Sequence, residues 1–465
     1  MGRLSLVIGQ AGTGKTTWLM DRARECAPAL ITTEHRSTLA ITRMHGARRR
    51  VELQLRESCP SIRCSVATID GFALSILNRW RTALGYAKPI QAVQGNVDFA
   101  TTIFGTEADF ARVVMAATGL LCSPMVRRVI AETYPLIIID EFQDCHGPLL
   151  DFVRALSEAS TVLLAADDFQ LLDAGVTGCP AVEWVTSVTD GGHAEITELT
   201  TCHRTSVQGI LDAASCLRNN AAADGRTIPV FYCPAKGPAA WKIVESLVFG
   251  SAPWTGTTAL ICPSHDPFVY EILDSCANQL QRRSCLPIRW HEERSTEKEQ
   301  EQIGSDLGLA DANGAPDSHW VCPTTELDSV CSHVVSRTQR FARLRGLQAI
   351  PRDVVARHID VVIHERRAYC SHFPPRILTT VHGAKNREFD NVFILWTYKL
   401  PPDKEQQRRL LYNAVTRAKR NCMLLVLGKA GRVQNDPVLS LLGTPQPVFG
   451  QKARRKTRSA KKAAT

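Results

Sequence analysis

Apolar runs that end in polar or glycine residues recur along the chain and predict buried strands. In the first part of the chain these runs cover residues 4–8, 29–33, 64–69, 134–139 and 161–166. Strands that are apolar on both faces are typical of a parallel sheet covered by helices on both sides. Helical segments at 17–23 and 73–80 follow two of these strands. The pattern therefore predicts an α/β domain with a parallel sheet.

The same pattern restarts in the second part of the chain. Strands are predicted at 195–199, 257–262, 377–381, 391–395 and 422–427, with helices at 206–218 and 406–420. The fold class predicted is α/β, with two doubly wound parallel-sheet domains that each carry a mainly helical insertion. The expected boundaries are 1–195 with an insertion at about 81–132, 196–450 with an insertion at about 282–376, and a disordered tail at 451–465.

A glycine-rich segment between the first strand and the first helix predicts a phosphate-binding loop. Its G-x-x-x-x-G-K-[ST] pattern is complete. The glycines let backbone N–H groups surround an anion, and the helix N-terminus adds partial positive charge. Lys15 can reach the β- and γ-phosphates, while the Thr16 hydroxyl can contact Mg²⁺. The candidate triphosphate site consists of Gly9, Gln10, Ala11, Gly12, Thr13, Gly14, Lys15, Thr16 and Thr17.

Two carboxylates follow the apolar run at 134–139. Asp140 and Glu141 form a Walker B arrangement, about 125 residues after the phosphate-binding loop. Asp140 is the candidate Mg²⁺ ligand together with Thr16. Glu141 is the candidate group that orients or deprotonates the water attacking the γ-phosphate.

The net charge of +9 is concentrated at the end of the chain. Residues 451–465 hold seven Lys and Arg residues and no acid, and without them the net charge falls to +2. Such a tail is typical of a disordered nucleic-acid-binding segment, because phosphate neutralisation releases counterions. A tail that only increases solubility is the alternative.

Composition excludes several classes of protein. No run reaches the ~18 apolar residues of a membrane span, and no signal peptide precedes the first strand. The sixteen cysteines form no C-x-x-C pair and no Cys/His spacing typical of zinc. We therefore expect reduced cysteines in a cytoplasmic protein, associated with the nucleoid if the source is bacterial.

The ordered motifs resemble those of superfamily 1 helicases of the UvrD/Rep type. Asp-Glu-Phe-Gln-Asp at 140–144 is very similar to motif II, and 408–419, Arg-Arg-Leu-Leu-Tyr-Asn-Ala-Val-Thr-Arg-Ala-Lys, is similar to motif VI. The other resemblances, in the family's order, are motif Ia at 32–35, the following motif at 68–72, motif III at 167–170, motif IV at 199–206 and motif V at 379–389.

The resemblance implies roles for residues outside the phosphate-binding loop. Gln170 would sense the γ-phosphate, and Glu388 would contact the ribose. Arg204 and Arg417 would reach from the second domain onto the γ-phosphate, as arginine fingers do. The positions implied to face DNA are Thr33, Thr68, Asp70, Phe72, Thr380 and His382, although Phe72 also has the spacing of a core residue.

Three departures from the family pattern affect what is expected. Motif III normally continues into a Tyr and a Trp that stack on bases, but here Leu171 and Leu172 follow Gln170, leaving Trp184 as a substitute platform. Asn386 replaces the glycine after the motif V lysine. The upstream glutamine motif that reads adenine has no room before the first strand.

The resemblance implies a DNA helicase or translocase that uses ATP and Mg²⁺ and moves 3′ to 5′. Its expected partners are single-stranded DNA, tailed duplex DNA and proteins of a replication or repair complex, with no membrane. A nucleotide-regulated single-strand-binding subunit with little unwinding is the alternative. A small-molecule kinase is disfavoured, because it explains neither motif VI nor the second domain.

Overall fold

The chain divides into two compact units. The computed structural model describes residues 3–448 apart from 43–44, 61, 103–104, 190, 193, 224, 226, 294–295, 310–318, 324–326, 370–373 and 398. The larger unit combines Met1–His291 with Pro374–Thr465, and the smaller unit is Glu292–Phe373. The basic tail at 451–465 lies outside the described residues.

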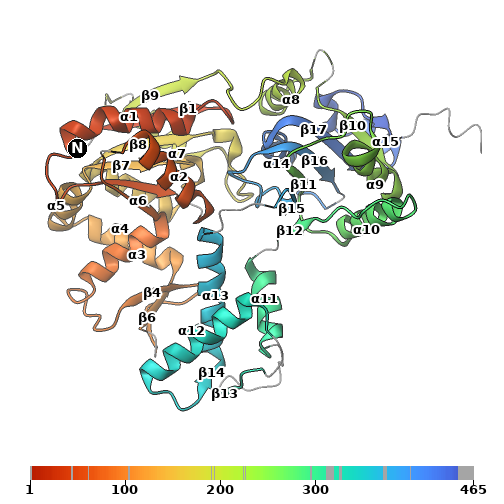
Figure 1. Ribbon diagram of the computed structural model, residues 1–465. Coiled ribbons are helices and arrows are strands. Elements are labelled where there is room, and N and C mark those ends of the chain that lie inside the picture. The colour runs from red at the N-terminus through yellow and green to blue at the C-terminus, as the bar shows by residue number, and fades with distance from the viewer. Residues whose placement is uncertain are drawn as a thin grey trace, which may run out of the picture. The chain divides into compact units, whose positions relative to one another are not determined.

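The larger unit contains two extended sheets (Figure 1). The first is a six-stranded parallel sheet, and we call this sheet with its helices the first lobe. Its strands, in spatial order, are β3 (Cys64–Thr68), β2 (Thr38–Thr42), β7 (Leu136–Ile139), β8 (Thr161–Ala166), β1 (Leu4–Gly9) and β9 (Ala194–Leu199).

Helices cover both faces of this sheet, as the apolar runs predict. Successive residues of a strand point to opposite faces, so Leu163 packs against α1 and α2 while Leu164 packs in the core formed with α3, α4, α6 and α7. The helices are α1 (Lys15–Leu30), α2 (His45–Ser58), α3 (Ile69–Trp80), α4 (Phe110–Leu121), α5 (Pro124–Thr133), α6 (Pro148–Ala159) and α7 (Pro180–Thr189). Two 3₁₀ turns, η1 (Phe142–Asp144) and η2 (Asp168–Gln170), follow β7 and β8.

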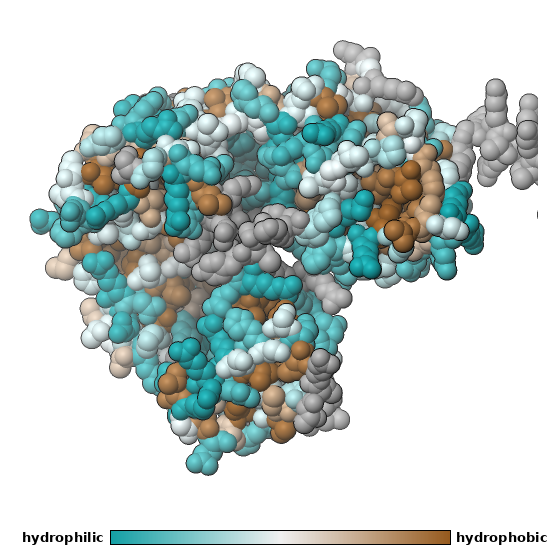
Figure 2. Space-filling model, in the orientation of Figure 1, coloured by the Kyte–Doolittle hydropathy of each residue, from teal (hydrophilic) through white to brown (hydrophobic). Residues whose placement is uncertain are grey.

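The second lobe is built on a seven-stranded sheet. Its order is β12 (His291–Glu292), β15 (Arg376–Thr380), β11 (Thr258–Cys262), β16 (Phe389–Trp396), β17 (Ala418–Leu427), β10 (Val230–Cys233) and β18 (Gln446–Pro447). One core forms against α8 (Gln208–Asn219) and α14 (Lys404–Val415), and another against α9 (Lys236–Val244) and α10 (Pro267–Gln281). Figure 2 shows apolar residues gathered over α9 and α10. The remaining elements are the π-helix η3 (Glu245–Phe249), α15 (Ala430–Gln434) and the 3₁₀ turn η4 (Leu439–Leu442).

The α/β fold class predicted from the sequence is confirmed: the chain contains two lobes, each built on a parallel sheet with helices packed on both faces. Part of region 81–132 also forms a small sheet that the sequence pattern did not predict, β4 (Ile90–Val93), β6 (Thr106–Asp109) and β5 (Ala100–Thr101). The exact domain boundaries stay a prediction.

The smaller unit is mainly helical. It contains α11 (Thr296–Asp306), α12 (Ser329–Arg345), α13 (Arg352–Tyr369) and the strand pair β13 (His319–Trp320) and β14 (Ile350–Pro351). Its own core is lined by Leu307, Trp320, Val334 and Val355. Over the described residues, no single helix is long and apolar enough to cross a membrane; the bent pair α4 and α5 meets that length and composition test only when taken together.

One predicted strand does not form, and another forms but belongs to the first sheet. Residues 29–33 do not form a strand, because α1 continues through Pro28 to Leu30, with Ala23 and Ala27 buried at helical spacing. The second strand of the chain is Thr38–Thr42, which is buried at every position. The strand at 195–199 does not begin the second domain either, since β9 pairs in parallel with β1 as the edge of the first sheet. Strand order along the chain does not reveal a pairing partner, so the pattern alone misplaced this strand.

Candidate nucleotide site

The phosphate-binding loop joins β1 to α1 at the carboxyl edge of the first sheet. Gly12 and Gly14 have φ angles of 82° and 86°, in the left-handed region that favours glycine. The loop leads directly into α1, whose N-cap is Gly14. Lys15 Nζ donates hydrogen bonds to the carbonyl oxygens of Gly9 and Gln10 at 2.8 and 3.0 Å. Its ammonium group is thereby held inside the loop.

The two predicted Mg²⁺ ligands lie together. Thr16 Oγ1 donates to Asp140 Oδ2 at 3.0 Å, and Asp140 is buried directly after β7. A hydroxyl and a carboxylate are hard oxygen donors of the kind that Mg²⁺ binds, and Mg²⁺ usually keeps several waters beside one or two such protein ligands. The pair therefore fits this ion. Among the described residues, no group of three or more His, Cys, Asp or Glu side chains could hold a metal.

Glu141 lies next to this pair in an unusual backbone conformation. Its φ and ψ of 58° and 41° are left-handed, which is uncommon for a residue other than glycine and is typical of functional sites. Its carboxylate accepts a hydrogen bond from Gln143 Nε2, and Gln143 Oε1 accepts one from the backbone N–H of Asp167. The side-chain amide of Gln143 thus fixes Glu141 relative to the residues that follow β8.

The electrostatic surroundings keep Glu141 ionised. Burial raises the pKa of Glu141, but the positive charges of Lys385 and Lys15 and the hydrogen bond from Gln143 outweigh this effect. The net pKa lies below the ordinary value of a glutamate, so the group is a carboxylate at neutral pH. An ionised carboxylate can accept a proton from water or orient it.

Arg204 approaches the phosphate-binding loop from the segment between the two sheets. The backbone N–H of His203 donates to Gly12 O at 2.8 Å. A Cβ at Gly12 would lie 2.5 Å from Arg204 Cβ, so the two segments are in direct contact. The Arg204 guanidinium donates to Glu388 Oε1 and to the Thr416 carbonyl, both at 2.8 Å.

Arg417 is buried beside Arg204. It is 2% exposed, and its guanidinium donates to the Asn413 carbonyl at 2.9 Å and to Thr416 Oγ1 at 3.3 Å. Burial lowers the pKa of Arg417 to about 10, and the neighbouring charge of Arg204 adds to this effect. The side chain is therefore still protonated at neutral pH. The structure brings both predicted arginines to the vicinity of the loop.

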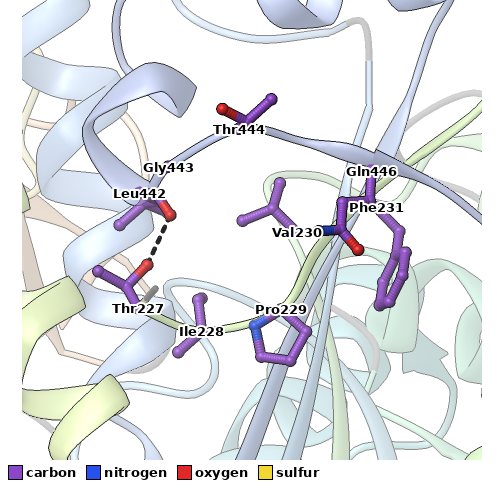
Figure 3. Close-up of a pocket in the computed structure, with 9 residues that line it drawn as sticks. All are labelled: Thr227, Ile228, Pro229, Val230, Phe231, Leu442, Gly443, Thr444 and Gln446. Carbon is purple, nitrogen blue, oxygen red and sulfur yellow. Dashed lines mark hydrogen bonds between the residues drawn. The ribbon is translucent and has the colours of Figure 1, made fainter. Parts of the chain in front are cut away.

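Glu388 joins the predicted arginine to a lysine. Its carboxylate pairs with Arg204 and, at 2.9 Å, with Lys419. Burial raises the pKa of Glu388, but the positive charges of Arg204 and Lys419 lower it by a larger amount. The net pKa of Glu388 therefore lies below its usual value. A hollow of about 570 Å³ lies next to this pair, lined by Cys202, His203, Arg204, Thr205, Ser206, Asp390, Lys419 and Arg420. A second hollow, beside β10 and β18 (Figure 3), contains none of the predicted site residues.

Gln170 lies at the end of η2 and is 4% exposed. Its backbone N–H donates to Asp167 O at 2.9 Å. Gln170 therefore belongs to a short turn directly after β8, on the same edge of the first sheet as the phosphate-binding loop.

The positions implied to face DNA separate into two groups. Thr68 and Asp70 lie at the end of β3 and the start of α3, where Thr68 Oγ1 accepts from the backbone N–H of Gly71. Thr380 ends β15, its hydroxyl accepts from Gly383 N, and His382 is exposed just beyond it. All four residues lie at the carboxyl ends of strands or just beyond them.

Thr33 and Phe72 do not join these groups. Thr33 precedes β2. The backbone N–H of nearby Ser37 donates to the carbonyl of Thr133, which comes before β7, so Thr33 lies at the amino edge of the sheet. The residue at the carboxyl end of β2 is Thr42, in register with Thr68. Phe72 is 4% exposed and its ring packs at 5.6 Å from Tyr134, so it is a core residue.

Sequence reasoning gave no role to two residues that the structure places at the site. Lys385 Nζ pairs with the buried carboxylate of Asp144 at 2.5 Å, which connects motif V to motif II. Arg218 pairs with Asp167 and Asp168 from α8. Lys385 lies inside a recognised motif, but Arg218 lies outside all of them and no sequence signal marks it.

Comparisons with known proteins agree with the motifs. A model of the UvrD-like helicase C-terminal domain matches residues 377–425, and a model described as an AAA domain matches residues 1–176. No curated protein matches the chain.

Two solved structures that resemble this chain are helicases. A Pif1 helicase from Bacteroides, in complex with ADP-AlF3 and single-stranded DNA, is 14% identical with a TM-score of 0.37, covering 99% of this chain and 94% of its own. An arterivirus nonstructural protein 10 helicase with DNA is 12% identical with a TM-score of 0.33, covering 95% and 63%. The two family models agree with the ordered motifs, and the chain resembles the UvrD/Rep-type superfamily 1 helicases.

Proposed function

We propose that this protein hydrolyses ATP with Mg²⁺ and uses the reaction to move 3′ to 5′ along single-stranded DNA and to unwind duplexes. The observation that carries the proposal is the convergence of groups from both lobes on one phosphate-binding loop. Lys15, Asp140 and Glu141 come from the first lobe, Arg417 comes from the second, and Arg204 comes from the segment that connects them.

Each group has a distinct part in the proposed hydrolysis. The loop amides and Lys15 bind the β- and γ-phosphates. Thr16 and Asp140 would hold Mg²⁺, which when bound neutralises charge on the phosphate oxygens. Glu141 orients the attacking water and accepts its proton, and the two arginines stabilise charge that develops on the γ-phosphate.

The two-lobe arrangement explains how hydrolysis could produce movement. Arg204 and Arg417 contact the γ-phosphate only while the lobes are held together around it. Loss of that phosphate removes the contacts and favours separation, which supplies a two-state element. Strand contacts at the carboxyl ends of β3 and β15, including Thr68 and Thr380, would then alternate in spacing during each cycle.

Strand displacement tests the direction of movement. With a duplex that carries a 3′ single-stranded tail, we expect the protein to displace the short strand when ATP and Mg²⁺ are present. A matched duplex with a 5′ tail should remain intact, and neither should be displaced with a non-hydrolysable analogue. Displacement from 5′ tails alone would reverse the proposed polarity.

Deletion of residues 451–465 tests the role of the basic tail. We expect the shortened protein to bind single-stranded DNA more weakly and to keep its DNA-independent ATPase rate. Each phosphate contact that is lost should reduce the slope of log affinity against log salt concentration by about 0.7. Fluorescence anisotropy over a salt series measures both quantities. An unchanged slope would show that the tail does not contact DNA.

A regulatory single-strand-binding subunit is the second candidate function. It is favoured by Leu171 and Leu172, which are 2% and 6% exposed where family members carry base-stacking aromatic residues. Trp184 does not offer a free substitute, because its ring packs against Phe142 and Arg154. Tight nucleotide-dependent DNA binding without hydrolysis would support this candidate. In either role we propose a cytoplasmic protein that works with partners in replication or repair.

A further inference from the structure

The side chain of Asp167 is a buried carboxylate held by both lobes. It follows β8 in the first lobe and is 0% exposed. Arg218, from α8 of the second lobe, donates to its Oδ1 at 2.5 Å. Tyr412, from α14 of the second lobe, donates to its Oδ2 at 2.9 Å. A buried carboxylate requires such partners, because an unpaired charge in the interior is costly.

The hydroxyl of Tyr412 also contacts the phosphate-binding loop. The backbone N–H of Ala11 donates to it at 3.1 Å. The carboxylate of Asp167 can only accept hydrogen bonds, so the direction of both bonds is fixed. The Ala11 N–H donates to the Tyr412 oxygen, and the Tyr412 O–H donates to Asp167. Tyr412 is 0% exposed, and its ring packs edge-on against Phe169 at 5.1 Å. Bonds connected in this way polarise one another.

Asp167, at the end of this series of hydrogen bonds, also fixes the turn that contains Gln170. Asp167 Oδ1 accepts from the backbone N–H of Phe169 at 3.2 Å and caps η2. The carbonyl of Asp167 accepts from the backbone N–H of Gln170 at 2.9 Å. A movement of Asp167 therefore changes the position of Gln170. The phosphate-binding loop and the Gln170 turn both belong to the first lobe, yet the side chain that joins them comes from the second.

We propose that Tyr412 is a positioning residue that transmits the conformation of the phosphate-binding loop to the Gln170 turn, and that it does so only while the second lobe is engaged. Arg218 supports it by holding the Asp167 carboxylate. This inference rests on the proposed ATP hydrolysis. It predicts that the Tyr412 hydroxyl affects turnover and its stimulation by DNA more than it affects nucleotide binding.

The Tyr412→Phe variant removes one oxygen and keeps the ring in the core. We expect kcat for ATP in the presence of single-stranded DNA to fall about tenfold, as the loss of one hydrogen bond to a charged group allows. KM for ATP should stay within about twofold, since Lys15 and the loop amides remain. The matched control is Tyr232→Phe, at a half-buried tyrosine of β10 in the same lobe, which should behave as wild type.

A double-mutant cycle with Asp167→Asn distinguishes transmission from a purely structural role. If both residues act in one chain of hydrogen bonds, the double variant should be no slower than the slower single variant by more than about twofold. Losses that multiply would overturn the proposal. So would a Tyr412→Phe variant with a lower Tm but an unchanged kcat and DNA stimulation.

Lobe closure separates failure of this inference from failure of the proposed function. Small-angle scattering of the full chain with a non-hydrolysable ATP analogue needs no turnover. The radius of gyration of the wild type should fall when the analogue binds. At the same nucleotide occupancy, the fall for Tyr412→Phe should be at least severalfold smaller. If wild type closes more than Tyr412→Phe but does not hydrolyse ATP, the proposed function fails while the role of Tyr412 is supported. If both proteins close equally, the role of Tyr412 is refuted.

Discussion

Replacing Glu141 by glutamine is expected to leave nucleotide binding intact and to reduce kcat for ATP by about 10²- to 10⁴-fold, the contribution of a well-placed general base. Glutamine has the same shape, and its amide oxygen can still accept the hydrogen bond from Gln143. It cannot accept a proton from the attacking water. Steady-state phosphate release and equilibrium binding of a fluorescent ATP analogue measure the two effects separately.

Glu158→Gln is the matched control for this variant. Glu158 pairs with Arg127 at the surface of the first lobe, where ion pairs contribute little. Its kcat should equal that of wild type. Normal turnover in Glu141→Gln would remove Glu141 from the catalytic role and direct attention to another acceptor near the loop.

Replacing Arg417 by glutamine is expected to reduce kcat by about 10³-fold or more, within the range attributed to arginine fingers. The side chain is protonated despite its burial, and the last turn of α14 carries no basic residue that could replace its charge. The affinity for ADP, which has no γ-phosphate, should change by less than about threefold. Single-turnover kinetics and ADP titration measure the two quantities.

Arg204→Gln provides a second variant, because the buried position of Arg417 makes its replacement a risk to folding. Arg204 has a side chain that is 16% exposed and should tolerate the change better. It should show a loss of the same order, together with release of Glu388 from its ion pair. Arg56→Gln, which breaks a surface ion pair in α2, is the control and should keep the kcat of wild type. If both site variants keep wild-type kcat, hydrolysis does not depend on the second lobe.

The phosphate-binding loop was predictable from sequence because its pattern depends on local spacing. Gly12, Gly14 and Lys15 act within one loop, and the strand and helix on either side are short-range features. Asp140 and Glu141 were also predictable, since polar residues at the end of a buried parallel strand lie at the edge where sites form.

The contacts that connect the lobes were not predictable in the same way. Asp167, Arg218 and Tyr412 meet only after both sheets have formed, and 51 and 245 residues separate Asp167 from its two partners. The strand β9 was misplaced for a related reason: its pattern identifies a strand but not the neighbour with which it pairs. Thr33 was chosen because residues 32–35 resemble motif Ia, but the run before it is the end of α1 and not a strand.

Phe72 shows how one residue can satisfy two patterns. Its position after a strand matched a DNA-facing motif, while its spacing in α3 matched a core position. Packing against Tyr134 and Phe152 decides for the core. A base could stack on this ring only if the hydrophobic core around it opened.

ATP hydrolysis with and without single-stranded DNA tests the central claim most directly. The full chain should be assayed with Mg²⁺ over a range of oligonucleotide concentrations, with Glu141→Gln as the blank. We predict a low basal rate that rises at least tenfold at saturating DNA and disappears in the variant. Intact DNA binding with no stimulated hydrolysis would contradict the motor and leave the nucleotide-regulated binding subunit as the better account.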